Sequence, residues 1–454
     1  MFLLNKLTNK LSPNKKKVAL NLYWATIGKV VNMLGALFVG ILVARYLGPE
    51  QYGLMNYIIS YVAIFSILSN FGLDNIEIRE LAKNIDDKDK VNSILGTCLR
   101  IRLLFAFIAF ILVCITVYMF ETSMSTSILI MVYASSMFVT IFNVIRNYFT
   151  SIVQNEYVVK TEISRTLIGA VIKIVLLWFK APLSLFIVAS LFDFYLVAGG
   201  YIVSYHEKVG KLKKWKYDRS IVPFMLKESF PLLLSGAAVI IYQRIDQVMI
   251  KNMIDAKSVG YFATAGKFVG LILFIPTVIA QTITPLLVRA KENNIEDYKI
   301  KRQQFVSVMV WLSIVISVIV SVLSYWLLLY TYGVKYLPAV PVLQIMAFKT
   351  VGMALSSSAG QLIIIDRIQK WAVIRNIIGC IVCIGFNYIL IPHYGIIGSA
   401  WVTIISVIFA GFLSNLLIPP YWYIFKIEVR AIFFGWKEFI NIIKLLIRSG
   451  LKLE

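Results

Sequence analysis

The stretch TCLRIRLLFAFIAFILVCITVYMF, residues 97–120, determines the class of fold. Two arginines near its start are followed by eighteen uncharged, mostly apolar residues, Leu103–Phe120. A helix of about 20 apolar residues crosses the hydrocarbon core of a bilayer, so this stretch predicts a transmembrane helix. By the same criterion of length, about 12 spans can be marked along the chain. They are residues 19–45, 53–74, 97–120, 125–146, 161–180, 182–205, 228–251, 258–288, 303–331, 339–365, 371–391 and 395–418.

The composition of the whole chain is also that of a membrane protein. Of its 454 residues, 59% are hydrophobic and only 15% are charged, whereas soluble domains are about half apolar and about a quarter charged. The formal net charge of +22 does not indicate nucleic acid as a partner, because the basic residues lie in short connections between apolar spans. We therefore predict an all-α polytopic membrane protein that is surrounded by the lipid bilayer.

The distribution of basic residues predicts how the spans are oriented. Most of the 45 Lys and Arg residues lie in alternate connections, both chain ends included. Basic connections stay in the cytoplasm, and an even number of spans returns the chain to the side where it began. We therefore expect both termini to be cytoplasmic and the outward connections, such as 121–124 and 332–338, to be short.

The most basic connection lies near the middle of the chain and reads HEKVGKLKKWKYDR, residues 206–219. We expect residues 206–227 to be a cytoplasmic linker between two six-helix lobes, 19–205 and 228–418, as in transporters built from parallel repeats. A shift of 207 residues aligns Gly53 with Gly260, each just before the next span. This alignment is a short internal echo of such a repeat.

The two ends of the chain lie outside these lobes. Residues 1–18 are expected to form a cytoplasmic segment, and three leucines on one helical face suggest that it lies along the membrane surface. Residues 419–454 show apolar side chains at helical spacing, interrupted by basic ones. We expect them to form a cytoplasmic or interfacial amphipathic tail, with an additional span as the less favoured alternative.

Several charged residues lie within the apolar spans, where a central Lys costs roughly 2.5–3.5 kcal/mol. The basic ones are Lys29, Lys173, Arg244, Lys267 and Lys349, and the acidic ones are Asp193 and Asp246. On one interpretation the basic residues, which outnumber the acids, line a hydrated path for an anion. On the other, they belong to packing networks inside the membrane. The sequence leaves both interpretations open.

The spacing of these residues adds detail. Glu162, Arg165, Gly169 and Lys173 follow one another at intervals of three or four and share one helical face. Asp246 lies two residues after Arg244, on a different face of its helix, so at least one of them needs another partner. Asp246 is either the structural partner of a basic residue or an ion-coupling site, and we favour the structural role.

No pattern typical of an enzyme or a metal site is visible. Cys380 and Cys383 form a CxxC inside an apolar span, so we interpret them as buried thiols. His206 and His393 lie in connections, and no phosphate-binding loop of an ATPase is present. We therefore expect a protein without catalytic residues, metal or cofactor.

Three stretches resemble a known family. They are LVARYLGPEQYGLMNY (Leu42–Tyr57), RIDQVMIKNMIDAKSVGYFATAGKFVGLILFIPTVIAQTITP (Arg244–Pro285) and NYILIPHYGIIGSAWVT (Asn387–Thr403). Together they are similar to the bacterial polysaccharide transporter family, which includes the flippases for repeat units of O-antigen, capsule and exopolysaccharide. That family belongs to the multidrug/oligosaccharidyl-lipid/polysaccharide (MOP) exporter superfamily. The resemblance extends over roughly residues 19–418.

The resemblance implies a flippase in the bacterial cytoplasmic (inner) membrane. Its substrate would be undecaprenyl-pyrophosphate-linked oligosaccharide, carried between the leaflets by alternating access through a central cavity between the two lobes. The implied partners are a polysaccharide polymerase and a chain-length regulator, and Na⁺, H⁺ or the membrane potential would drive transport. The candidates for the basic lining of the cavity are Lys29, Arg45, Lys173, Arg244, Lys267 and Lys349.

Three other functions stay open. A flippase for lipid II or another lipid-linked sugar is the nearest, although its known representatives usually have more spans. A cation-coupled multidrug exporter would favour acidic residues in its cavity, whereas this chain has a basic excess. A membrane polysaccharide polymerase or glycosyltransferase would need an extramembrane catalytic loop, and the outward connections are too short to supply one.

Overall fold

The computed structural model describes the backbone of residues 13–450 and the side chains of residues 24, 27–442 and 444. All secondary structure in this part of the chain is helical, which confirms the prediction of an all-α membrane protein. Within it, nine helical stretches are long and apolar enough to cross a membrane. The expected interfacial segment 1–18 lies mostly outside the described residues.

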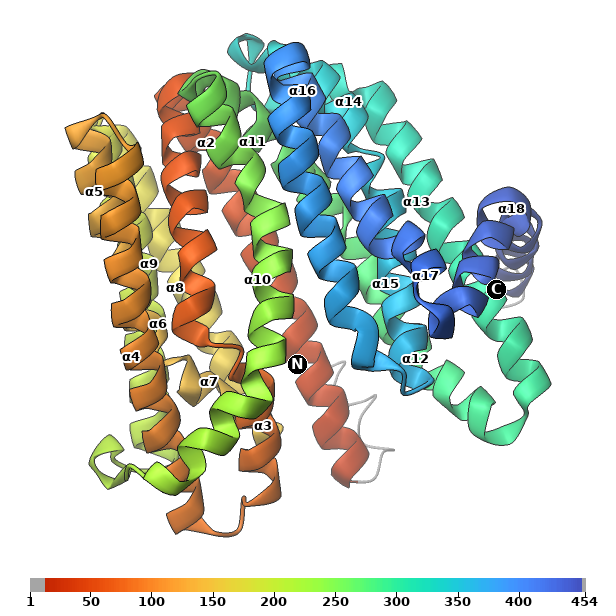
Figure 1. Ribbon diagram of the computed structural model, residues 1–454, viewed down its shortest axis with the longest axis horizontal. Helices are drawn as coiled ribbons and strands as arrows, with labels where there is room; N and C mark the ends of the chain where they lie inside the picture. Colours follow the sequence, from red (N-terminus) through yellow and green to blue (C-terminus); the bar gives the residue numbers. More distant parts are fainter. Residues whose placement is uncertain (1–12, 451–454) are drawn as a thin grey trace. The chain divides into compact units, whose positions relative to one another are not determined.

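The chain divides into two compact units. Unit 1 contains the described residues up to Leu47 together with Ile58–Ala237, and unit 2 contains Gly48–Tyr57 and the described residues from Ala238 onward. The helices numbered up to the linker, with short 3₁₀ turns omitted, are α2 (Pro13–Asn70), α3 (Asp74–Lys83), α4 (Lys88–Phe120), α5 (Met124–Ala134), α6 (Ser136–Thr140), α7 (Asn143–Ser151), α8 (Asn155–Trp178) and α9 (Leu183–Lys208) (Figure 1).

The remaining helices follow the linker. They are α10 (Val222–Met253), α11 (Ala256–Ile272), α12 (Phe274–Asn293), α13 (Ile295–Thr331), α14 (Val340–Met346), α15 (Lys349–Ile365), α16 (Ala372–Ile408), the π-helix η5 (Phe409–Leu413), α17 (Ser414–Leu417), the 3₁₀ turn η6 (Pro419–Tyr421) and α18 (Trp422–Gly450). The first part of α10, up to Ala237, belongs to unit 1. The units therefore divide α10 inside the span that we assigned to the second lobe.

Two glycines bend the longest helices. Gly48 in α2 has φ 75° and Gly395 in α16 has φ 59°, a left-handed conformation that residues with a Cβ rarely adopt. Each bend separates two predicted spans. Helices therefore occupy every predicted span. Nine stretches of the described chain pass the test of length and apolarity, in which a bent helix that contains two spans counts once. The span at 161–180 coincides with α8, which carries too many charged residues to be among the nine.

The core of unit 1 lies where α3, α4 and α7 meet, and the linker packs beside it. Leu81, Leu95 and Phe149 are fully buried there. In the linker, the backbone N–H of Lys216 donates to the carbonyl of Asn92 at 3.2 Å. The basic connection predicted as a linker is thus fixed to α4, with its lysines on the outside.

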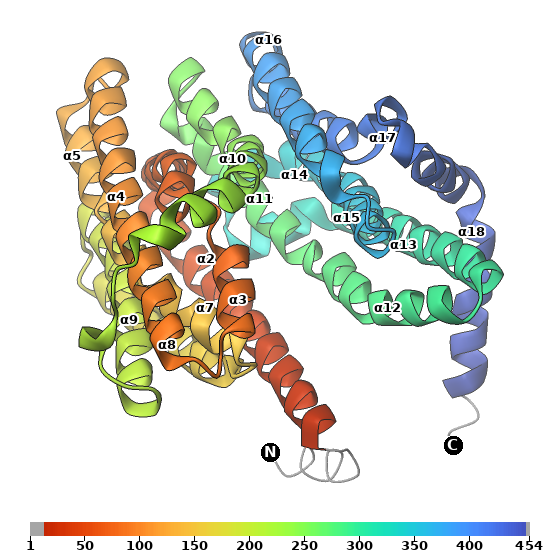
Figure 2. The ribbon, with the colours of Figure 1, turned by 60° about the horizontal axis from the view of Figure 1, so that its bottom comes forward.

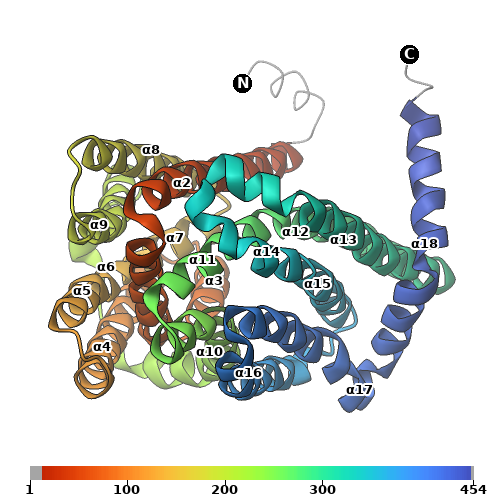
Figure 3. The ribbon, with the colours of Figure 1, turned by 90° about the horizontal axis from the view of Figure 1, so that it is seen from above.

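The core of unit 2 is formed by α12, α13 and α15, which lie side by side (Figure 2). The last helix, α18, lies across α13 (Figure 3). Its first half is part of this core, because Ala431 is fully buried and its carbonyl accepts a hydrogen bond from Trp311 Nε1 at 2.9 Å. Phe433 and Phe434, farther along, are exposed. The amphipathic tail helix is therefore present, and its first half is packed inside unit 2.

The two glycines of the internal echo lie against each other inside unit 2. A Cβ on Gly53 would lie 1.7 Å from the carbonyl oxygen of Ala256, and a Cβ on Gly260 would lie 2.0 Å from that of Pro49. The segment Gly48–Tyr57 is thereby packed backbone to backbone against α11. Glycine is required at both positions because any side chain would separate the two backbones.

Candidate functional site

The charged residues that the sequence singled out are divided between the units. Unit 1 carries Lys29, Arg45, Lys173 and Asp193, and unit 2 carries Arg244, Asp246, Lys267 and Lys349.

In unit 1, the polar stripe of α8 packs against α2 and α9. The Glu162 carboxylate accepts hydrogen bonds from Asn32 Nδ2 at 3.3 Å and from the Tyr201 hydroxyl at 3.2 Å. Thr166, one turn further along α8, donates to Asn32 Oδ1. These contacts join three helices through neutral donors and one acid, which is an arrangement that fixes helix packing in a membrane.

Lower on the same stripe, Lys173 forms an ion pair with Asp193 of α9. Its Nζ lies 2.6 Å from Asp193 Oδ2, and each side chain is 15% exposed. Gly169 makes room for this pair, because a Cβ there would lie 2.2 Å from Asp193 Oδ1. An acid partner thus compensates the charge of Lys173 within unit 1. Glycine at position 169 of the predicted stripe is explained by the space that the Asp193 side chain needs.

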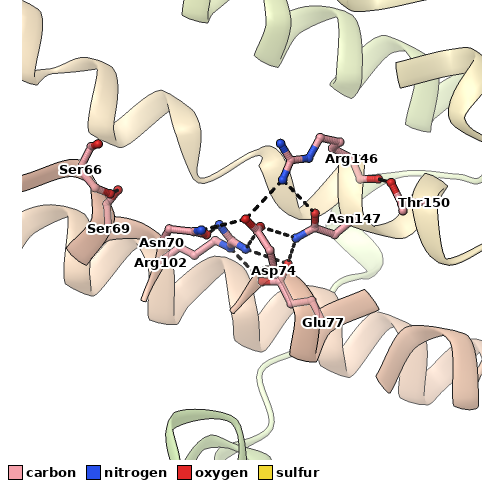
Figure 4. A network of polar contacts seen from close by, with 9 residues as sticks. All are labelled: Ser66, Ser69, Asn70, Asp74, Glu77, Arg102, Arg146, Asn147 and Thr150. Carbon is pink, nitrogen blue, oxygen red and sulfur yellow. Dashed lines mark hydrogen bonds and ion pairs between the residues drawn. The ribbon is translucent and has the colours of Figure 1, made fainter. Parts of the chain in front are cut away.

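A larger polar network joins α3, α4 and α7 (Figure 4). The Arg102 guanidinium is 1% exposed and contacts both oxygens of Glu77, with Nε at 2.8 Å and a terminal nitrogen at 2.9 Å. The same terminal nitrogen lies 2.9 Å from Asp74 Oδ1. Asn147 donates to both acids, at 2.8 Å to Asp74. Because Glu77 and Asn147 are fully buried, the network needs all of these partners.

Sequence reasoning missed this network. Arg102 lies near the start of the predicted span 97–120, Asp74 is the last residue of the span 53–74, and Glu77 follows it in a connection. The spacing of the two acids, three residues apart, places both on one helical face and was the available signal. Arg146 completes the network by contacting Asp74 Oδ2 at 3.3 Å. Two acids and two arginines balance, so this site holds no surplus charge for a substrate.

In unit 2, Asp246 lies at the centre of a second buried group. It is 2% exposed and accepts hydrogen bonds from Asn387 Nδ2 at 2.5 Å and from the Cys383 thiol at 3.3 Å. Lys349, at the start of α15, interacts electrostatically with both Asp246 and Arg244. The structure thus brings three predicted residues together on α10 and α15. It adds Asn387, for which no sequence signal was available, and Cys383, one of the two cysteines of the CxxC interpreted as buried thiols.

The remaining predicted residues lie nearer the surface of their units. Lys29, Arg45 and Lys267 are exposed, whereas Arg244, already described beside Lys349, is partly buried. The acids Asp193 and Asp246 are both engaged by other side chains, so the predicted set as a whole has a basic excess. No group of His, Cys, Asp and Glu among the described residues is suited to hold a metal ion.

Comparison with known proteins shows the family. Residues 18–291 match the family described as polysaccharide biosynthesis protein. The chain belongs to this family. The match covers more than half of the chain and includes two of the three stretches that carried the predicted resemblance, which is thereby confirmed. No curated protein sequence matches the chain.

Several solved structures share the fold of this polysaccharide biosynthesis protein. A multidrug resistance MATE family transporter of the MOP superfamily, in an inward-facing conformation, aligns with a TM-score of 0.63 and 16% identity over 89% of this chain and 99% of that chain. The lipid II flippase MurJ, in an inward closed conformation, aligns with a TM-score of 0.66 and 17% identity over 94% and 96% of the two chains.

A third structure is a MOP superfamily transporter from Pyrococcus furiosus, for which a binding pocket of reverse polarity suggests a different function. It aligns with a TM-score of 0.58 and 15% identity over 94% of this chain and 96% of that chain. The shared fold is that of MOP superfamily transporters, and the chain is a polytopic membrane protein.

Proposed function

We propose that the protein is a flippase that moves undecaprenyl-pyrophosphate-linked oligosaccharide from the inner to the outer leaflet of the bacterial cytoplasmic membrane. The observation that carries the proposal is the match to a polysaccharide biosynthesis family in a chain with the MOP transporter fold. The flipped repeat units would serve the assembly of O-antigen, capsule or exopolysaccharide. A polymerase and a chain-length regulator would act after the flippase.

The excess of basic residues within the helices supports an anionic substrate. A lipid pyrophosphate carries roughly two negative charges, which Lys and Arg bind through charge-assisted hydrogen bonds. Lys29, Arg45 and Lys267 are exposed, so a headgroup can approach each of them. The polyprenyl tail needs no binding site of its own because it remains soluble in lipid.

A multidrug exporter is the less favoured function, although the MATE fold is shared. An exporter of cationic drugs needs accessible acids, whereas Asp193 is paired with Lys173 and Asp246 is bonded to Asn387. The Pyrococcus furiosus transporter supports the view that one fold can carry pockets of either polarity. A lipid II flippase differs from our proposal in the headgroup that the lipid pyrophosphate carries, so the experiment below includes both substrates.

We propose further that the membrane potential assists an alternating-access cycle. Outward movement of an anion from an inside-negative compartment gains about 2.3 kcal/mol per charge per 100 mV, or about 4–5 kcal/mol for a dianion. Flipping in proteoliposomes should accelerate when an inside-negative potential is imposed. Equal flipping rates with and without the imposed potential, together with a dependence of the rate on Na⁺ or pH, would show that ion coupling drives transport instead of the membrane potential.

The decisive experiment reconstitutes the full chain with fluorescent undecaprenyl-pyrophosphate-linked oligosaccharide or with lipid II. The variants are Lys267→Ala, Lys267→Arg and Lys257→Ala, because both lysines are exposed on α11 and only Lys267 lies deep in a predicted span. We expect several-fold slower flipping for Lys267→Ala, and activity close to wild type for the other two. Absence of flipping with either lipid, in protein that is correctly folded, would refute the proposed function.

A further inference from the structure

A buried polar group in unit 2 lies where α18 meets the π-helix η5. A π-helix leaves backbone carbonyls outside the regular hydrogen-bond pattern. Here Arg375 donates to two of them, from Nε to Ala410 O at 3.1 Å and from a terminal nitrogen to Gly411 O at 3.0 Å. These two bonds direct the guanidinium toward the backbone of η5.

Glu428 of α18 lies in the same group and is fully buried. One of its oxygens, Oε2, accepts a hydrogen bond from Asn415 Nδ2 at 2.8 Å. The other, Oε1, has no hydrogen-bond partner among the described residues. Among the side chains that the structure describes, none forms an ion pair with this carboxyl group, so a negative charge there would be costly.

Asn415 has the complementary deficit. It is also fully buried, and its two amide hydrogens are used by Glu428 and by Gly411 O, the latter at 2.9 Å. Its Oδ1 has no donor among the described residues. The group therefore contains two buried acceptor oxygens, one on each of two neighbouring side chains, and no donor for either of them. One added hydrogen atom would supply the missing donor.

We propose that Glu428 is a proton-binding site, and that its proton, shared with Asn415, holds α18 against the rest of unit 2. The proposal stands apart from the identity of the lipid-linked sugar, because it depends only on contacts within unit 2. Protonation converts the carboxyl group from a buried anion into a neutral group with one donor, and it leaves the bond from Asn415 intact. Loss of the proton leaves an uncompensated charge beneath α18.

The surroundings of Glu428 agree with this assignment. α18 is not one of the nine apolar stretches of the described chain, and burial raises the pKa of Glu428 well above its ordinary value. Arg375 of α16 is the charged group that acts on it and opposes this shift. The neutral groups around this site are Asn415 of α17, which donates to Glu428, Tyr421 of η6, whose ring lies against Arg375, and Gln303 of α13, which donates to Ile427 O at 3.2 Å.

The sign of the pH effect follows from the raised pKa. Between the ordinary pKa of a glutamate and the raised one, the unfolded chain has lost the proton while the folded chain keeps it. The contribution of Glu428 to thermal stability should therefore be largest below the ordinary pKa of a glutamate and should fall as the pH rises toward the folded pKa of Glu428. Glu428→Gln carries a permanent donor on an isosteric neutral group, so it should lack this decline, match wild type in acid and be more stable than wild type at neutral pH.

The test compares wild type with Glu428→Gln and with Glu438→Gln, a partly exposed acid on the same helix. Infrared spectra of the purified full chain at neutral pH should show the C=O band of a protonated carboxylic acid in wild type and in Glu438→Gln. Glu428→Gln should lack the component of that band that Glu428 contributes. Trypsin cleavage at the exposed Lys426 and Arg430 should increase at alkaline pH in wild type more than in Glu428→Gln.

Two results would overturn the proposal. Identical infrared spectra for wild type and Glu428→Gln would show that no proton resides on Glu428 at neutral pH. Stabilisation of wild type by Na⁺, measured against choline and absent in Glu428→Gln, would show that a metal cation satisfies the two oxygens. If Glu428→Gln does not fold, spectra of wild type and of Glu438→Gln are each compared between neutral and alkaline pH. Both proteins keep Glu428, so both should lose a protonated carboxyl band in the alkaline range, and absence of that loss in both would overturn the proposal.

Discussion

Two arginines of unit 1 show how far burial changes the weight of a single charge. Arg102 is 1% exposed and is held by two acids, whereas Arg79 forms its ion pairs with a side chain that is 41% exposed. Removing one partner of a buried ion pair leaves the others uncompensated, at a cost of about 3–5 kcal/mol. An exposed pair contributes less than about 1 kcal/mol.

We therefore expect Arg102→Ala to destabilise the protein by about 3–5 kcal/mol and Arg79→Ala to change stability by less than about 1 kcal/mol. The stability of both variants is measured by thermal or denaturant unfolding in detergent, with size-exclusion chromatography as the readout. Equal effects for the two variants would mean that the network in Figure 4 contributes no more than a surface pair.

Variants of the ion pair between Lys173 and Asp193 distinguish the two interpretations of the charges in the spans, a hydrated path for an anion and a packing network. We expect Lys173→Ala to lower stability, and the double variant Lys173→Ala/Asp193→Ala to recover it, with a coupling energy of about 0.5–3 kcal/mol. The double variant should then also recover transport. If the double variant regains stability but remains inactive in flipping, Lys173 has a second role. It then contacts the substrate as well as forming the ion pair with Asp193.

At the scale of the elements, the contact between the segment Gly48–Tyr57 and α11 depends on the close approach of their two backbones. We expect Gly53→Val to destabilise by about 1–3 kcal/mol, because the side chain would meet the carbonyl of Ala256. The control is Gly270→Ala on α11, where a Cβ would meet no atom within 4 Å. That variant should gain up to about 1 kcal/mol of helix propensity. Unfolding midpoints of the two variants should shift in opposite directions.

The elements also show what the sequence could predict. Apolar length predicted every span, because a helix in lipid satisfies its backbone hydrogen bonds locally. The bends at Gly48 and Gly395 fall between spans marked from the sequence. The sequence could not predict that the first half of α18 packs on α13, because the same apolar face fits a membrane surface or another helix equally well.

At the scale of the whole molecule, the alternation of basic connections makes a prediction about topology. In a variant without native cysteines, Ser123→Cys in the connection after α4 should react with an impermeant thiol reagent in intact cells. Lys213→Cys in the linker should react only after permeabilisation, since basic connections remain in the cytoplasm. The reverse pattern would place the termini outside and would contradict the direction of transport that we propose.

The sequence by itself determined the class of fold, the positions of the spans and the family, because apolar length, basic connections and short motifs are local properties of the chain. The tertiary structure alone decided which charges have partners. Arg102 meets Asp74 and Glu77 of another helix, and Asp246 meets Asn387, far along the chain. Inside a bilayer the free energy of a charged residue depends on the neighbour it faces, and that neighbour is set by how the helices pack.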